Sequence, residues 1–221
     1  MSIQLFILFL LITIGIHELG HLLAANALKK KILYFSIGFW RPYLKFQLFN
    51  IEFRLTPWLI GGELKIDGEN NLSKKGFLNS PYHEKLILCL SGITMNMILA
   101  CLIWIWQYHW NFLIGFYYDY QILVVAWFNS PKAGDLLFEY FSKYNADLLI
   151  FSMLNTWAFL TNILPVPSLD GGYIWLPWLE KLMPKKKYLK IINLLTKIGF
   201  WTLMIGQAIY LIWFLKYGVF K

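Results

Sequence analysis

Charged residues are scarce in this chain of 221 residues. Only 14% of its residues are Asp, Glu, Lys or Arg, whereas 58% are hydrophobic. Soluble domains usually carry about a quarter charged residues, so the composition excludes an ordinary soluble domain and indicates an integral membrane protein. The net charge of +8 does not indicate a nucleic-acid partner. The basic residues lie beside apolar runs, where membrane orientation and anionic lipids account for them.

Cysteine is also scarce, and the positions of the two cysteines exclude two kinds of site. Cys89 and Cys101 fall in one apolar run, where helical geometry separates them by about 18 Å, too far for a disulfide. No Cys-x-x-Cys pair occurs, so we do not expect a thiolate metal site. The sequence has neither an internal repeat nor a low-complexity linker. We therefore expect a single domain over residues 1–221.

The chain contains long apolar runs with few charged residues. A helix crosses a bilayer with about 20 apolar residues, and four runs qualify, at about 3–28, 84–106, 147–164 and 189–215. The fold class predicted is an all-α membrane bundle of about four transmembrane helices. The first run lacks the basic start of a signal peptide, so we expect a retained helix. Residues 107–129 indicate an interfacial segment or a partial re-entry, and an additional membrane segment there stays open.

The distribution of Lys and Arg predicts how the bundle is oriented. Ten of the twenty lie between Lys29 and Lys85, six lie between Lys181 and Lys197, and only two lie between the second and third runs. Because positive loops stay in the cytoplasm, we expect both rich loops there and both termini outside. The sequence thus predicts a multi-pass protein of the plasma membrane.

Residues 43–56 alternate between apolar and polar side chains on both sides of Phe49-Asn50. This pattern predicts a β-hairpin with one apolar face. A hairpin between two spans can dip into the membrane only where protein or water satisfies its backbone. From the pattern alone, a hairpin lying on the cytoplasmic lipid surface is favoured.

Three ionisable residues interrupt the first apolar run. His17 and His21 are four residues apart, so a helix places them on one face, where they can bind a single Zn²⁺. Glu18 lies beside them and can serve as a general base without binding the metal. Such residues are disfavoured in a hydrocarbon span unless they serve a site. A catalytic zinc needs a third protein ligand, which the motif does not supply.

Asp170 is the candidate for the third ligand. It stands in the stretch NILPVPSLDGG, where prolines end the third helix and the glycines allow a close approach of the backbone. The alternative is an Asp that caps the following short helix. Together with the histidines, the ligand role is favoured. Asn96, Asn155 and Asn162 also lie in apolar runs, and hydrogen bonding between helices is their default interpretation.

At these residues the chain resembles the site-2 proteases, which are intramembrane zinc metalloproteases. The sequence HELGH at 17–21 matches the zinc motif of that family, and the stretch at 162–172 is similar to its Asn…Pro…Leu-Asp-Gly motif. SGITMN at 91–96 resembles the family's Gly-Pro-x-x-Asn, with Ile93 in place of proline. Residues 36–66 resemble its membrane re-entrant β-hairpin and Gly-Gly stretch. The resemblance replaces the surface hairpin by a re-entrant one.

The resemblance implies hydrolysis of a peptide bond in or near a transmembrane segment, as in regulated intramembrane proteolysis. It implies His17, His21 and Asp170 as zinc ligands and Glu18 as the base. It suggests Asn162 as a substrate or oxyanion contact, and the hairpin edge near Phe53 with Gly61 and Gly62 as substrate contacts. We expect the site in the cytoplasmic half of the bilayer. The chain stops soon after its last run, so we expect no C-terminal regulatory domain.

The partners implied are a transmembrane substrate, membrane lipids and a regulatory membrane protein, without nucleic acid. Two other functions remain open from the sequence. A non-proteolytic metal-binding scaffold would keep the histidines but would not need Glu18. A zinc transporter would need a polar path that reaches both faces of the membrane. The substrate, the trigger and the oligomeric state are not encoded in any motif that we find.

Overall fold

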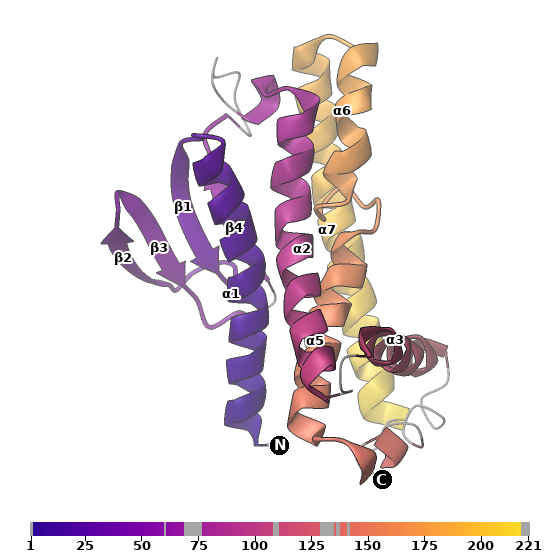
Figure 1. The fold of residues 1–221 in the computed structure, drawn as a ribbon. Helices are drawn as coiled ribbons and strands as arrows, with labels where there is room; N and C mark the ends of the chain where they lie inside the picture. The colour runs from indigo at the N-terminus through magenta and orange to yellow at the C-terminus, as the bar shows by residue number, and fades with distance from the viewer. Residues whose placement is uncertain are drawn as a thin grey trace.

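The computed structural model describes residues 2–59, 61–68, 77–107, 111–128, 135, 138–140 and 142–217. Four long helices form a bundle (Figure 1), and each coincides with an apolar run of the sequence. Their bounds are α1 (Ile3–Ala27), α2 (Tyr82–Gln107), α5 (Ala146–Asn162) and α7 (Lys185–Tyr217). A short helix, α6 (Gly172–Leu182), joins α5 to α7 through the segment that carries Asp170.

The helix ends follow local chemistry. Ser2 caps α1 by accepting a hydrogen bond from the backbone N–H of Leu5 at 3.2 Å, and Asn145 caps α5 in the same way. Proline cannot continue a helix, and α5 ends at Asn162, just before Pro165 and Pro167. The position of Asp170 is therefore fixed by the end of α5.

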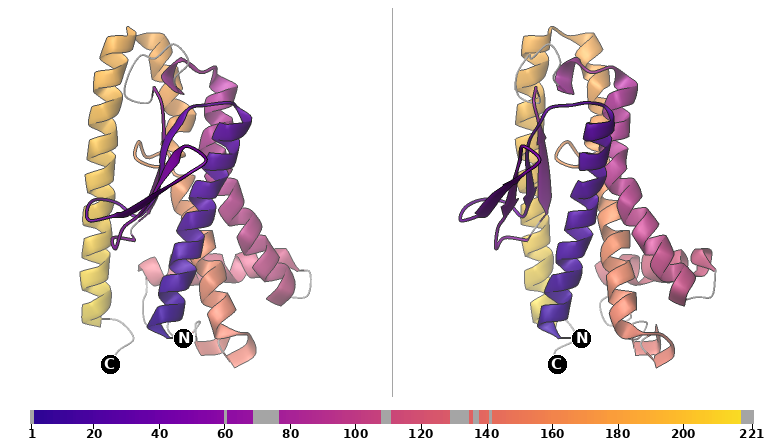
Figure 2. Two further views of the ribbon diagram at one scale, coloured as in Figure 1. Left: turned by 90° about the vertical axis from the view of Figure 1, so that its left-hand side faces the viewer. Right: turned by 60° about the vertical axis from the view of Figure 1, so that its left-hand side comes forward.

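The helices partly confirm the predicted fold class. Within the described residues, α1, α2 and the Lys185–Gly206 part of α7 are long and apolar enough to cross a membrane. Helix α5 has 17 residues, slightly short of a full span. The start of α1 and the far end of α7 lie at one end of the bundle, and the end of α1, the start of α2 and the junction of α6 with α7 lie toward the other (Figures 1 and 2). This arrangement agrees with two rich loops on one side of a membrane.

A four-stranded mixed sheet lies beside α1. The strands are β1 (Ile32–Ile37), β2 (Leu44–Leu48), β3 (Ile51–Leu55) and β4 (Gly62–Ile66), in the order β2-β3-β1-β4. The predicted hairpin is confirmed as the antiparallel pair β2 and β3. Its turn, Phe49-Asn50, has positive φ at both residues, 51° and 62°, as hairpin turns of two residues require. Strands β1 and β4 enlarge this hairpin into a sheet.

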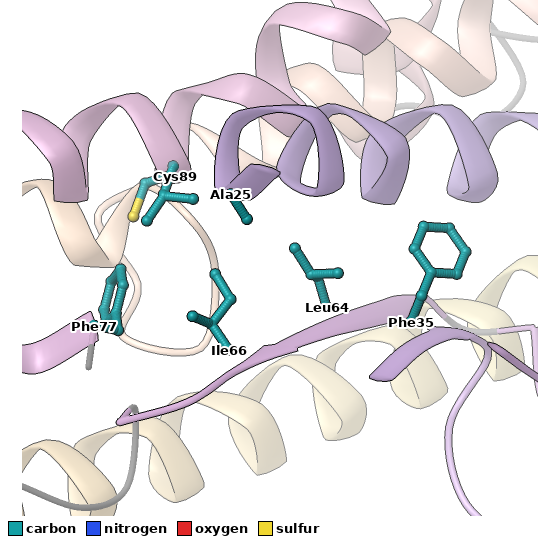
Figure 3. Close-up of a cluster of buried hydrophobic side chains, with 7 residues drawn as sticks. Ala25, Phe35, Leu64, Ile66, Phe77 and Cys89 are labelled. Carbon is teal, nitrogen blue, oxygen red and sulfur yellow. The ribbon is translucent and has the colours of Figure 1, made fainter. Parts of the chain in front are cut away.

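One face of the sheet packs on the helices. Phe35, Leu64 and Ile66 point from β1 and β4 toward Ala25 of α1 and Cys89 of α2 (Figure 3). All are less than 10% exposed, and burial of apolar side chains of this size contributes about 2 kcal/mol each. This core fixes β4 against the second half of α1, which carries HELGH.

Helix α3 (Phe112–Phe128) lies across the bundle rather than along it (Figure 2). Its Asp119 is fully buried and accepts hydrogen bonds from Trp104 of α2 at 2.9 Å and from Thr156 of α5 at 2.8 Å. Ser152 of α5 donates a third at 3.1 Å. These bonds tie α3 to two bundle helices, which agrees with an interfacial or partly inserted segment at residues 107–129. They do not test an additional crossing.

Candidate metal centre

His17 and His21 face the interior of the bundle from adjacent turns of α1. The Nε2 atoms of the two rings lie 3.2 Å apart, as expected for residues four apart on a helix. His17 is only 8% exposed. Two imidazole nitrogens are thus presented side by side to one point beside α2.

Asp170 reaches this point from the far end of the chain. After α5 the backbone folds back, and the N–H of Gly171 donates to the carbonyl oxygen of Asn162 at 2.7 Å. A Cβ at Gly171 would lie 2.4 Å from the carbonyl oxygen of Ile163, so this reversal requires glycine. The turn brings Asp170 Oδ2 to 3.0 Å from His17 Nε2 and 3.2 Å from His21 Nε2.

The orientation of each ring is fixed by its other nitrogen. His17 Nδ1 lies 2.6 Å from Asn96 Oδ1, and His21 Nδ1 lies 2.7 Å from the carbonyl oxygen of Leu88. Both oxygens only accept, so each Nδ1 donates. In the neutral rings that metals bind, both Nε2 atoms are then free of hydrogen and present lone pairs.

Asn96 has no freedom to reverse its amide. Its Nδ2 donates to the carbonyl oxygen of Thr13 at 3.1 Å and to Asn155 Oδ1 at 3.0 Å. Asn96 and Asn155 are fully buried, so each unsatisfied amide group would be costly. The default interpretation of these asparagines as helix-to-helix contacts is confirmed, and Asn96 in addition orients a candidate ligand.

The convergence of three acceptors suits a cation. Asp170 Oδ2 is buried and, with both histidine rings neutral, has no hydrogen-bond donor within the described residues. The separations of 3.0 to 3.2 Å are close to the edge of about 3.3 Å of a tetrahedron with bonds of about 2.0 Å. Within the described residues, these three side chains lie close enough together to hold one metal ion, and they are called the metal-binding group below. The donor set of two imidazoles and a carboxylate fits zinc.

Glycines let the surrounding elements approach the ligands. A Cβ at Gly92 of α2 would lie 2.4 Å from His21 Nε2 and 2.8 Å from His17 Nε2. A Cβ at Gly20 of α1 would lie 2.5 Å from the carbonyl oxygen of Ser91. The two helices therefore cross closely because each lacks a side chain at the crossing.

Glu18 lies between the metal-binding group and the sheet. It is 5% exposed, and a Cβ at Gly62 of β4 would lie 2.5 Å from its Cγ. A cleft of about 690 Å³ is lined by Glu18, His21 and Asp170 on one side. Every residue of β4 lines the same cleft, and side chains of α7 close it on the opposite side. Glu18, two of the three candidate ligands (His21 and Asp170) and strand β4 thus share one cavity.

Only some of the residues that were predicted to contact the substrate lie at the cleft. Gly62 lines the cleft, and Gly61 packs against Phe39, which also lines it. Asn162 donates from Nδ2 to the carbonyl oxygen of Ala158 in its own helix at 3.0 Å. Phe53 lies outside the cleft lining, and its ring stacks on that of Phe46 with centroids 5.3 Å apart.

The expectation of an open sheet edge near Phe53 is wrong. Strand β3 is flanked by β2 and β1, so the edges of the described sheet are β2 and β4. Sequence alternation detected the hairpin but could not reveal that β1 adds to β3 in parallel, with Phe35 opposite Phe53. The edge that faces the metal-binding group is β4.

Metalloproteases use two histidines, a nearby glutamate and a third ligand. Here the histidines and the glutamate lie on α1, which has membrane-spanning length and composition, and the carboxylate lies in the turn between α5 and α6. The chain is thus placed in the class of membrane metalloproteases. Comparison with known proteins identifies the family: residues 5–206 match peptidase family M50, and the chain belongs to this family, that of the site-2 proteases.

Several bacterial relatives bear the name "Putative zinc metalloprotease". The protein of Borreliella burgdorferi is 33% identical over 117 residues, which are 48% of this chain and 27% of the relative. That of Campylobacter jejuni is 34% identical over 98 residues, 40% of this chain and 26% of the relative. That of Thermotoga maritima is 31% identical over 112 residues, 48% of this chain and 22% of the relative. The matches span about a quarter of each relative's length.

Proposed function

We propose that this protein is an intramembrane zinc endopeptidase that cleaves peptide bonds in or near the transmembrane segments of membrane proteins. The observation that carries the proposal is the meeting of His17, His21 and Asp170 through three acceptor atoms 3.0 to 3.2 Å apart. Family membership and the names of the relatives support zinc as the metal.

The residues of the cleft divide the chemistry of peptide hydrolysis among them. His17, His21 and Asp170 would hold a zinc ion, which would supply Lewis acidity toward the scissile carbonyl group and the attacking water. Glu18 accepts a proton from the water that attacks the carbonyl carbon. As the C–N bond breaks, Glu18 returns that proton to the leaving nitrogen. Asn96 keeps His17 in the tautomer whose Nε2 faces the site.

The substrate is proposed to bind as an added strand on β4. An extended peptide can add main-chain hydrogen bonds to an exposed strand edge, and β4 pairs only with β1 within the described sheet. A helix must unwind before a protease can reach its amides. The edge of β4 would hold the unwound segment beside Glu18, and Asn162 is retained as a proposed contact at the end of α5.

The location of the site completes the proposal. Four crossings, with α5 as the third and the sheet as a re-entrant element, would place both lysine-rich connections in the cytoplasm. His21 is eight residues from Lys29, which corresponds to about 12 Å of helix. The site would then lie in the cytoplasmic half of the plasma membrane, where a regulatory membrane partner could control access to it.

The experiment is hydrolysis of a quenched fluorescent peptide with an apolar helical core by the full chain, purified in detergent. We expect cleavage that stops with a zinc chelator and resumes with added zinc. The Glu18→Gln variant should retain about one zinc per chain and lose at least about 1000-fold in rate. Glu139→Gln is the matched control, because Glu139 is exposed and pairs with Lys143 away from the cleft.

The two other functions give different results in the same preparation. A scaffold would bind zinc and leave every peptide intact. A transporter would move zinc into vesicles at a rate that Glu18→Gln does not change. Cleavage by Glu18→Gln at the wild-type rate would refute the proposed role of this residue as the base.

A further inference from the structure

Lys197 is a charged residue in the part of α7 that could cross a membrane, Lys185–Gly206. It lies twelve residues beyond Lys185, which corresponds to about 18 Å along the helix axis. A lysine at such depth is costly unless it faces a cavity or a partner of opposite charge. In the structure Lys197 faces a cavity.

Lys197 lines the same cleft as Glu18 and the metal-binding group. It reaches the cleft from α7, opposite strand β4. Its helix is fixed at this level, because Thr196 Oγ1 donates to the carbonyl oxygen of Pro167 at 3.1 Å. A Cβ at Gly199 would lie 3.1 Å from Ser168 Oγ. Lys197 is therefore held beside the turn that delivers Asp170.

The other charges of the cleft balance one another. Glu18 and Asp170 together offset the two positive charges of a bound zinc ion. Glu63 of β4 accepts a hydrogen bond from Tyr34 at 2.7 Å and lies 3.7 Å from Lys65. Within the described residues, Lys197 has no ion pair with any carboxylate. With zinc bound, the cleft carries one uncompensated positive charge, at Lys197.

We propose that Lys197 determines specificity by binding a carboxylate of the substrate segment that enters the cleft. The inference rests on the proposed peptidase function and adds to it a class of substrate. The carboxylate belongs to an Asp or Glu side chain near the scissile bond or to the chain terminus of a short membrane peptide. Both sources present the same acceptor to Lys197, which is exposed at the cleft, and a charge-assisted hydrogen bond favours either one.

The test uses one set of quenched fluorescent peptides that share an apolar core. One peptide is neutral with an amidated end, one group carries a single Asp moved through the core, and one has a free terminal carboxylate. The measured quantity is the ratio of kcat/KM for each acidic peptide to that for the neutral peptide. It is measured for the wild type, Lys197→Gln, Lys197→Glu and the control Lys190→Gln, a lysine of α7 outside the cleft lining.

We expect a ratio of about ten or more in the wild type and in Lys190→Gln for at least one acidic peptide. The ratio should fall to about one in Lys197→Gln and below one in Lys197→Glu. The peptide that responds, with Asp or with a free terminus, identifies the source of the carboxylate. A wild-type ratio near one for every acidic peptide, or a ratio unchanged in Lys197→Gln, would overturn the inference.

A binding measurement separates this inference from the proposed peptidase function. The same peptides are titrated into the zinc-loaded Glu18→Gln protein, with and without Lys197→Gln, and binding is followed by fluorescence anisotropy. Tighter binding of acidic peptides that depends on Lys197 supports the inference even if the wild type cleaves none of them. Equal binding of all peptides with intact cleavage refutes the inference and leaves the peptidase function standing.

Discussion

Replacement of Gly92 by alanine should abolish the metal centre without disturbing α2. The added Cβ would lie 2.4 Å from His21 Nε2 and 2.8 Å from His17 Nε2. Ordinary van der Waals contact begins near 3.4 Å, so the ring of His21 would have to retreat by about 1 Å. Metal ligands tolerate displacements of only about 0.5 Å. We therefore expect zinc affinity to fall by at least about 100-fold.

The assay is zinc competition with a chelator of known affinity, combined with circular dichroism. Alanine favours a helix over glycine by about 1 kcal/mol, so Gly92→Ala should keep its helix content while zinc is lost. Gly15→Ala is the matched control on α1, because its Cβ would meet only Ile37 Cδ1 at an ordinary 3.5 Å. Wild-type zinc affinity in Gly92→Ala would refute the geometry derived for the centre.

Three further predictions concern the elements around the centre. Asn96→Leu removes the acceptor of the His17 Nδ1 hydrogen bond and should lower zinc affinity about 10- to 100-fold in chelator competition. Asn96→Asp retains an acceptor, and its zinc affinity should fall far less. Equal losses of affinity in the two variants would contradict the role of Asn96 in orienting His17. Asp119→Ala leaves the buried donors of Trp104 and Thr156 without their acceptor, whereas Ser152 keeps the carbonyl oxygen of Leu149. It should destabilise the protein by about 3 kcal/mol in thermal unfolding; an unchanged midpoint would show that this cluster contributes nothing. Lys65→Pro on β4 should reduce the rate of peptide cleavage while zinc is retained, whereas Lys45→Pro on the opposite edge strand β2 should leave the rate unchanged. Equal cleavage rates in the two variants would refute binding of the substrate as a strand added to β4.

The parts of the structure that local sequence periodicity encodes were predictable. Apolar runs located the four long helices, and alternation located the hairpin of β2 and β3. The spacing of His17 and His21 placed two candidate ligands on one helix face. Asp170 was predictable as a candidate ligand because prolines and glycines marked an irregular turn in an otherwise apolar segment, and the structure brings it within 3.2 Å of both rings.

The parts that depend on long-range pairing were not predictable from one sequence. Strand β1 pairs in parallel with β3 and antiparallel with β4, and no local pattern specifies partners across a loop. The hydrogen bond from His17 Nδ1 to Asn96 Oδ1 joins two helices, and the sequence does not reveal that these helices cross. Its one available signal was the occurrence of Gly92 and Asn96 four residues apart, which places both on one face of α2.

Asp170 is synthesised long after His17 and His21, so the three-residue centre cannot form during early synthesis. Helix α1 leaves the ribosome with two imidazoles, which hold a metal only weakly without a third ligand. Glu18 then has no completed metal site beside it. Only when α5 has formed and its terminal turn has closed does Asp170 complete the set. The order of the three residues along the chain thus delays assembly of the candidate metal centre until about three quarters of the chain has been synthesised.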